Sequence, residues 1–140
     1  MDNFKNIHIG ELIHQVVKER NVDDYRISKF FNCNEQEVKQ MYLQKSIDTE
    51  LLLSWGKLLK YDFFRIYSHH LALYSPPKRI DVSEKTTLPV FKKNIYTIEL
   101  INFILEKIDN KSLTKKEVME KYNIPKTTLY KWIRKYQNNG

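Results

Sequence analysis

Positively charged side chains gather near the end of the chain. The stretch after Lys121 contains no Asp or Glu, and it carries four cations: Lys126, Lys131, Arg134 and Lys135. Residues 1–75 contain 10 Lys or Arg and 10 Asp or Glu, whereas residues 76–140 contain 14 and 7, so the net charge of +7 arises in the second part. A strongly basic segment on a small chain favours a polyanionic partner, and its more ordinary interpretation is a well-solvated surface.

Residues that support catalysis or metal binding are sparse. The chain has one cysteine, Cys33, and the adjacent His69 and His70 lack a third ligand at metal-binding spacing, which favours a solvated helix end. The sequence has neither a phosphate-binding glycine loop nor a nucleophile motif. A chain of 140 residues also offers little concavity for an active site. We therefore expect a protein that is not an enzyme and that has no cofactor, metal or small-molecule substrate.

The composition predicts an all-α fold. Hydrophobic residues make up 41% of the chain and aromatic residues 13%, which is enough for a buried core. The chain has only 3 glycines and no convincing alternation of apolar and polar residues, so strands have little support. No apolar run reaches the roughly 18 to 20 residues of a membrane span, and the polar N-terminus lacks the pattern of a signal peptide. We expect a cytoplasmic protein without a membrane partner.

Apolar residues at helical spacing predict a first helical unit over residues 1–74. Two short helices are expected at Asp24 to Phe31 and at Asn34 to Leu43, with a tight turn between them. Asp48 is expected to cap a further helix. The stripes of the helices before and after this pair are Ile9, Leu12, Ile13, Val16 and Val17, and Leu51, Leu52, Trp55, Leu58 and Leu59.

A linker and a second helical unit are expected after residue 74. Prolines and weak periodicity predict a linker over residues 75–93, and residues 94–140 predict a basic unit of three helices. Thr114 and Glu117 have the spacing of a capping box, and Pro125 suits the first turn of the last helix. The apolar positions of this unit are Ile98, Ile101, Ile104, Leu105 and Ile108, then Val118, Met119 and Tyr122, then Leu129, Trp132, Ile133 and Tyr136.

The two units share one spacing at a constant offset of 91 residues. The pairs that correspond are Ile27 and Val118, Ser28 and Met119, Phe31 and Tyr122, Asn32 and Asn123, Cys33 and Ile124, and Val38 and Leu129. This spacing resembles the helix-turn-helix family twice. The turn of that motif needs a residue that tolerates positive φ, and asparagine follows glycine in this tolerance. An apolar residue then fills the angle between the helices, and another anchors the second helix.

Residues 7–67 resemble Xre- and Cro-type repressor domains. The resemblance implies a recognition helix from Asn34 to Leu43, on which Gln36 and Gln40 read adenine edges while Lys39 and Lys45 reach phosphates. Nearby carboxylates oppose DNA binding through charge repulsion: Asp23, Asp24, Glu35 and Glu37. The alternative is that this unit forms a homodimer or binds another protein, and for the homodimer its apolar tail would be the covered surface. That tail comprises Tyr61, Phe63, Phe64, Tyr67, Leu71, Leu73 and Tyr74.

Residues 95–137 resemble the homeodomain-like helix-turn-helix of insertion-sequence transposases, notably in the run from Ile124 to Trp132. The resemblance implies that Thr127, Thr128 and Lys131 meet base edges in a major groove. It also implies phosphate contacts by five further cations: Lys115, Lys116, Lys121, Arg134 and Lys135. Lys126, on the recognition helix, is a further candidate for DNA binding. A transposase catalytic domain would need three separated carboxylates on a mixed sheet. The chain is too short for such a domain and its sequence predicts no strands, so the resemblance extends to DNA binding alone.

These patterns predict a protein that binds double-stranded DNA with sequence specificity. It would act as a transcription regulator, or as a helper encoded by a mobile element, associated with the bacterial nucleoid. The rival hypothesis is an interaction module whose first unit dimerises or binds another protein and whose basic unit adheres to DNA without sequence preference. RNA binding is a third alternative, and it lacks the usual sheet of exposed aromatic residues.

Overall fold

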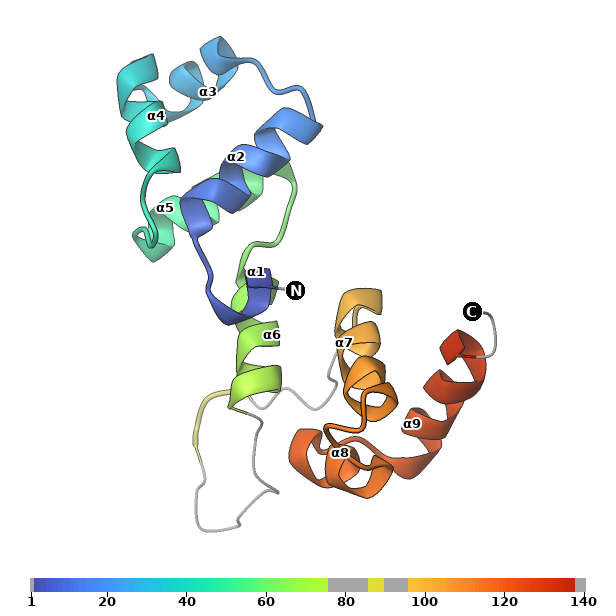
Figure 1. The fold of residues 1–140 in the computed structure, drawn as a ribbon. Helices are drawn as coiled ribbons and strands as arrows, with labels where there is room; N and C mark the ends of the chain where they lie inside the picture. Colours follow the sequence, from blue (N-terminus) through green and yellow to red (C-terminus); the bar gives the residue numbers. More distant parts are fainter. Residues whose placement is uncertain (1, 76–85, 90–95, 138–140) are drawn as a thin grey trace. The chain divides into compact units, whose positions relative to one another are not determined.

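The regular structure in the described part of the chain is helical. A computed structural model describes residues 2–75, 86–89 and 96–137, and within these ranges it contains helices and no strand (Figure 1). The all-α fold expected from the sequence is therefore confirmed. No helix in these ranges combines the length and the apolar character that a membrane-spanning segment needs. Most of the expected linker, residues 75–93, lies outside the described residues, and residues 86–89 have no regular structure.

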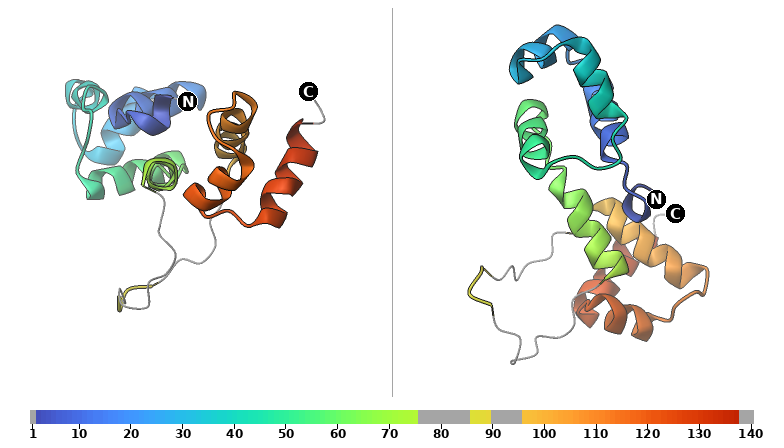
Figure 2. Two further views of the ribbon diagram at one scale, coloured as in Figure 1. Left: turned by 60° about the horizontal axis from the view of Figure 1, so that its bottom comes forward. Right: turned by 90° about the vertical axis from the view of Figure 1, so that its left-hand side faces the viewer.

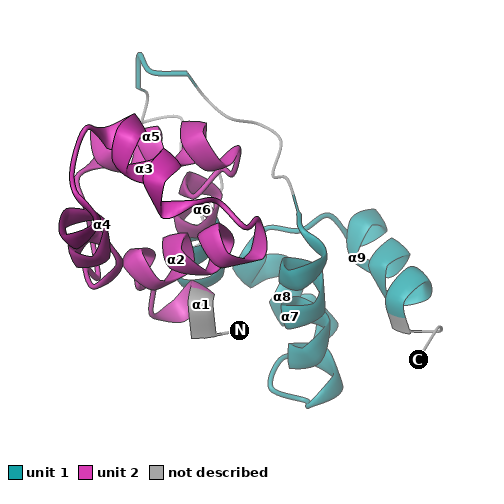
Figure 3. Cartoon of the chain, turned by 90° about the horizontal axis from the view of Figure 1, so that it is seen from above, with its two compact units in different colours: residues 1, 69–140 teal, residues 2–68 magenta. Residues whose placement is uncertain are grey.

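The described residues divide into two compact units, residues 2–68 and residues 69–137 (Figure 3). The division falls within helix α6 (Phe64–Tyr74). The sequence instead predicted that the first unit ends at residue 74. The last residues of α6 belong with the second unit because the ring of Tyr74 lies 6.4 Å from that of Phe103, between ring centroids.

The first unit contains α1 to α5 and the start of α6. Its helices are α1 (Asp2–Lys5), α2 (Ile9–Glu19), α3 (Asp24–Phe31), α4 (Glu35–Tyr42) and α5 (Thr49–Leu59). The fully buried side chains of Ile9, Ile13, Ile27 and Trp55 form the centre of its core, and the ring of Phe31 lies 4.6 Å from that of Trp55. The stripes expected on α2 and α5 therefore face the core. The sequence did not predict α1.

A close approach of two segments requires the glycine at position 10. The N–H groups of Ile9 and Gly10 donate to the carbonyls of Lys45 and Gln44, both at 3.0 Å, where the chain leaves α4. A Cβ on Gly10 would lie 2.7 Å from the carbonyl oxygen of Gln44. Any larger residue would therefore force α2 away from the end of α4.

Helix α6 corrects the expectation for the histidine pair. His69 is buried at 7% exposure rather than solvated, because it shares the inner face of α6 with Ile66 and Leu73. These three residues lie at positions i, i+3 and i+7 of one helix, so they form one stripe. His70 is half-buried. The expected solvated helix end was therefore wrong.

The second unit continues with three helices and a π turn. Helix α7 (Ile98–Asp109) buries Leu100, Ile101, Ile104 and Leu105. Helix α8 (Lys115–Tyr122) leads through a short turn into α9 (Lys126–Trp132), as the left view in Figure 2 shows in orange and red. The sequence predicted that α-helical spacing would run on to Tyr136. The structure instead changes to a π-helix over Ile133–Gln137, in which backbone bonds span five residues.

Candidate nucleic-acid interface

The turns after α3 and α8 have the same backbone geometry. Asn32 ends α3 with φ 52° and ψ 50°, and Asn123 ends α8 with φ 52° and ψ 49°. The N–H of Cys33 donates to the carbonyl of Ser28 at 3.0 Å, and the N–H of Ile124 donates to that of Met119 at 3.1 Å. The left-handed conformation expected at both asparagines is confirmed. We call α3 with α4 the first helix pair, and α8 with α9 the second helix pair.

The two helix pairs also share their anchors. Val38 on α4 is 2% exposed and Leu129 on α9 is 0% exposed, so each holds its second helix on the core as expected. Ile124 is buried directly after the turn, whereas its counterpart Cys33 is half-buried. The capping box at Thr114 is confirmed as well. The predicted spacing therefore describes the local geometry of both pairs.

Burial divides the residues of α9 into two faces. Leu129 and Trp132 face the core, and the ring of Trp132 meets that of Tyr96 at 4.8 Å in an edge-on contact. Thr127 and Lys131 are exposed, but Thr128 is half-buried. The outer face of α9 thus presents Thr127 and Lys131 together, whereas Thr128 lies at the boundary between the core and the surface.

Two lysines and a tyrosine form a cluster that joins α8 and α9. The Nζ of Lys115 lies 5.3 Å from the centre of the Tyr130 ring, and the Nζ of Lys126 lies 5.7 Å from it. A cation above an exposed aromatic ring gains about 0.5 to 1 kcal/mol from the ring quadrupole. Tyr130 therefore concentrates two ammonium groups on one side of the second helix pair. Sequence reasoning missed Tyr130.

The remaining cations expected to contact DNA are exposed: Lys116, Lys121, Arg134 and Lys135. Residues 115–137 contain 7 Lys or Arg and 2 Glu, which gives a net charge of +5. One of the two acids is occupied locally, because the Glu117 carboxylate accepts the N–H of Thr114 at 3.1 Å. The second helix pair thus has a strongly positive surface with Glu120 as its other acid.

The predicted contacts of the first helix pair lie in a different electrostatic setting. Gln36, Lys39, Gln40 and Lys45 are all exposed. Lys39 lines a cleft of about 430 Å³ together with three acids: Glu11, Asp24 and Glu35. The carboxylates of this cleft offset the positive charge that Lys39 would offer to a phosphate.

The same cleft contains a stacked histidine and tyrosine. The rings of His14 and Tyr42 lie 4.2 Å apart, between centroids, and are nearly parallel at 10°. Burial raises the pKa of Tyr42 to about 12, and Asp24 adds to this increase. The Tyr42 hydroxyl has no hydrogen-bond partner among the described residues. Tyr42 therefore stays neutral and acts as an apolar wall of the cleft.

Comparison of the chain with protein-family models, curated proteins and solved structures finds no match. The described residues also contain no group of three or more His, Cys, Asp and Glu side chains that could hold a metal. The charge and geometry of the two helix pairs are therefore the features that point to a function.

Proposed function

We propose that the chain is a sequence-specific DNA-binding protein that lacks a catalytic domain and holds double-stranded DNA through its second helix pair. The carrying observation is the exposed positive surface of α8, α9 and the π turn, on a scaffold anchored by Leu129 and Trp132. Clustered Lys and Arg on one helical surface neutralise DNA phosphates. The resemblance to transposase-type domains supports a role in transcription regulation or in a mobile element.

The outer face of α9 supports a division of roles. Thr127 and Lys131 are exposed at its beginning and centre, where a recognition helix meets base edges. Lys115 and Lys126, held around Tyr130, supply phosphate contacts on one side. Arg134 and Lys135 supply them beyond α9, on the π turn. Base contacts set the sequence preference, whereas phosphate contacts strengthen binding to every sequence.

Selection of binding sites from random duplexes, followed by anisotropy titration of selected and random DNA, tests this function. We expect tighter binding to the selected site and an affinity that falls linearly with the logarithm of salt concentration. Lys135→Ala should reduce the magnitude of that slope by about 1 on both duplexes. The control is Lys18→Ala, an exposed position of α2, which should leave the slope unchanged. Equal affinity for selected and random DNA would favour non-specific adhesion instead.

A second candidate function is self-association of the chain into a homodimer through an exposed face of α6. Phe63 of the apolar tail belongs to the core of the first unit and Leu73 is buried as well, but Phe64 is 37% exposed and Leu71 58% exposed. These two residues lie seven apart on α6 and share a face. Light scattering of the full chain tests this function: a dimer should become monomeric in the Phe64→Ser/Leu71→Ser variant. A monomeric parent protein at high concentration would refute it.

A further inference from the structure

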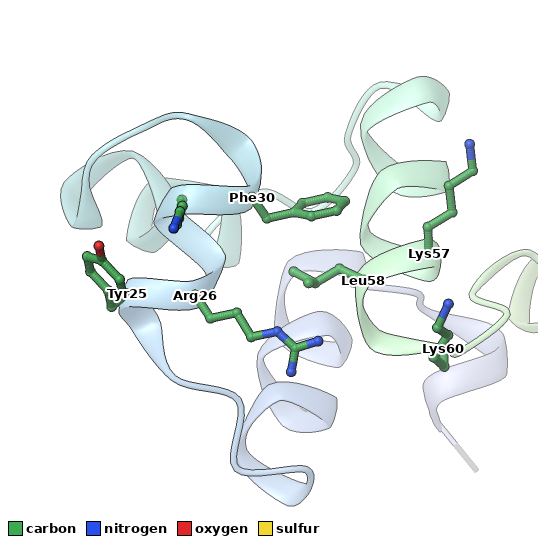
Figure 4. A pocket seen from close by; sticks show the side chains of 7 residues that line it. Tyr25, Arg26, Phe30, Lys57, Leu58 and Lys60 are labelled. Carbon is green, nitrogen blue, oxygen red and sulfur yellow. The ribbon is translucent and has the colours of Figure 1, made fainter.

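The neutral first unit contains a cleft with only positive charges. The cleft has a volume of about 490 Å³, lies between α3 and α5, and contains no carboxylate in its lining (Figure 4). Its cations are Arg26, Lys29, Lys57 and Lys60. Three acids of the same unit, Glu11, Asp24 and Glu35, instead line the cleft beside His14. The balanced total of this unit thus conceals two surfaces of different charge.

Two aromatic side chains lie open to solvent in this cleft. Tyr25 is 70% exposed and Phe30 49% exposed, whereas Trp55 in the same unit is fully buried. The Phe30 ring meets the Phe31 ring edge-on at 5.0 Å, and Phe31 in turn packs on Trp55. Figure 4 shows Phe30 and Leu58 pointing toward each other from the two helices. Phe30 is therefore held from one side by the core while half of its surface stays available to a ligand.

Lys60 occupies an unfavourable backbone conformation at the edge of the cleft. It ends α5 with φ 54° and ψ 44°, and its N–H donates to the carbonyl of Gly56. Three of the five non-glycine residues with positive φ in the described residues are asparagines, which tolerate this conformation best. Lys60 and Lys111 are the two lysines among these five residues, and Lys60 also lines the cleft. If Lys60 served only to form the turn, Asn could replace it without loss of function.

We propose that the cleft between α3 and α5 binds single-stranded nucleic acid. Unpaired bases would stack on Tyr25 and Phe30, while successive phosphates would pair with Arg26, Lys57 and Lys60. Proteins that hold single strands combine these two features, a positive groove and exposed aromatic rings. Bases in a duplex are already stacked on each other, so exposed rings favour a single strand. This site lies in a different unit from the duplex-binding surface and goes beyond the function proposed above.

The spread of the cations favours a polymer over a single small anion. Arg26 projects from α3, Lys57 from the last turns of α5 and Lys60 from its C-terminal end (Figure 4). We expect charges placed along two helices to pair with several phosphates of one strand rather than with a single small anion. A mononucleotide would engage only part of this set.

The test uses the full chain and a fluorescent oligothymidylate of about 12 nucleotides, within the range of site sizes for such proteins. In Lys57→Gln/Lys60→Asn, asparagine preserves the left-handed turn while both charges are removed. We expect single-strand affinity to fall about tenfold and the salt slope to decrease by about 1.4, since each phosphate contact contributes about 0.7. Duplex affinity should stay unchanged. The control Lys5→Gln/Lys18→Gln removes the same charge from exposed positions of this unit and should alter neither affinity.

The reciprocal variant separates this site from the second helix pair. Lys131→Ala should weaken duplex binding and leave oligothymidylate binding intact, so failure of either function is visible without the other. If the cleft variant weakens duplex and single strand equally, or weakens neither, the proposal is wrong. A thymidine mononucleotide that competes as well as the oligomer would also overturn it, because the site would then bind a small ligand.

The aromatic residues give an independent readout. Tyr25→Ala should lower single-strand affinity by at least about fivefold, the lower end of what one base–aromatic stack contributes. Since Tyr25 is 70% exposed, this change should leave the unfolding transition unaltered. Photo-crosslinking of an iodouracil-containing strand should map to Tyr25 or Phe30. Crosslinks confined to α8 and α9 would place the single strand on the second helix pair and refute the assignment.

Discussion

The first and second helix pairs have one backbone geometry and two electrostatic surfaces. Their first helices begin and end 91 residues apart, and both end at an asparagine in the left-handed region. Helix α4 carries two Glu and one Lys, whereas α9 with its π turn carries four cations and no acid. A turn depends on a few inward or strained positions, so the outward residues vary freely. Shared spacing therefore predicts geometry, and surface charge must predict the ligand.

The second helices also begin differently. The side chain of Asn34 accepts the N–H of Glu37 at 2.9 Å, and two glutamates in the first turn of α4 favour its N-terminus. Helix α9 instead begins after Pro125 with Lys126 and has no side-chain cap. Acidic residues near a helix N-terminus contribute about 0.3 to 1 kcal/mol each. Helix α9 lacks this local support, so it depends more on the burial of Leu129 and Trp132.

Removing the aromatic anchor of the second pair should have the largest effect. Trp132→Ala should lower the free energy of unfolding of the second unit by about 3 to 5 kcal/mol, because removal of the buried indole leaves a cavity. The counterpart 91 residues earlier is the half-buried Met41. Met41→Ala should cost about 1 to 2 kcal/mol. Denaturant unfolding followed by circular dichroism measures both, and equal losses would contradict the difference in how the two pairs are anchored.

Base reading should depend on the second pair alone. Lys131→Ala should cost about 1 to 3 kcal/mol on the selected duplex and relax preference at one base position. Lys135→Ala should weaken all sequences almost equally, since it supplies a phosphate contact. Gln40, the counterpart of Lys131 in the first pair, should be replaceable by Ala with no change in the selected motif. A uniform loss for Lys131→Ala, with the motif retained, would show that α9 does not read bases.

The shared turn should respond in the same way in both pairs. Asn32→Ala and Asn123→Ala should each destabilise their unit by about 1 kcal/mol, because alanine tolerates positive φ poorly. Glycine at either position should stay within about 0.5 kcal/mol of the parent, since glycine adopts this conformation readily. Thermal unfolding of the four single variants checks the prediction. A large loss from Gly would indicate that an asparagine side chain makes a contact beyond its backbone role.

Local pattern predicted the parts of this molecule that depend on neighbours in sequence. The stripes on α2 and α5, the cap at Thr114 and the left-handed asparagines each follow from residues within one or two turns of a helix. Two-fold recurrence of one spacing also indicated the matching turns. Helix α6 was harder to interpret because its inner face includes His69, a residue type that is common at solvated positions too.

The parts that the sequence did not predict depend on how helices meet. Lys115 and Tyr130 lie on different helices, and only the angle between α8 and α9 places the ammonium over the ring. Similarly, Arg26 and Lys57 come from α3 and α5, so the balanced charge of the first unit hid their convergence. The π turn after Trp132 has no local signature, because its residues suit an α-helix equally well.

The smallest expected effect is a difference between the two units in how their stability depends on pH. Burial lowers the pKa of His14, Lys18 adds to the decrease, and Asp24 opposes it. The unfolded chain, with a histidine pKa of about 6.5, then binds more protons than the folded chain below that pH. The stability contribution of His14 is therefore complete above about pH 6.5 and is lost as the pH falls toward the lowered pKa.

Hydrogen exchange of the full chain between about pH 5.5 and 7.5, corrected for the intrinsic pH dependence of exchange, measures this difference. Protection of α2 to α5 should decrease at the acidic end, whereas protection of α7 to α9, which contain no histidine, should change less. His14→Phe keeps a ring against Tyr42 but cannot titrate, so it should flatten the response of the first unit. If protection of α2 to α5 still decreases at acidic pH in this variant, a group other than His14 causes the decrease. The titration of His14 would then not explain why the first unit is more sensitive to acid.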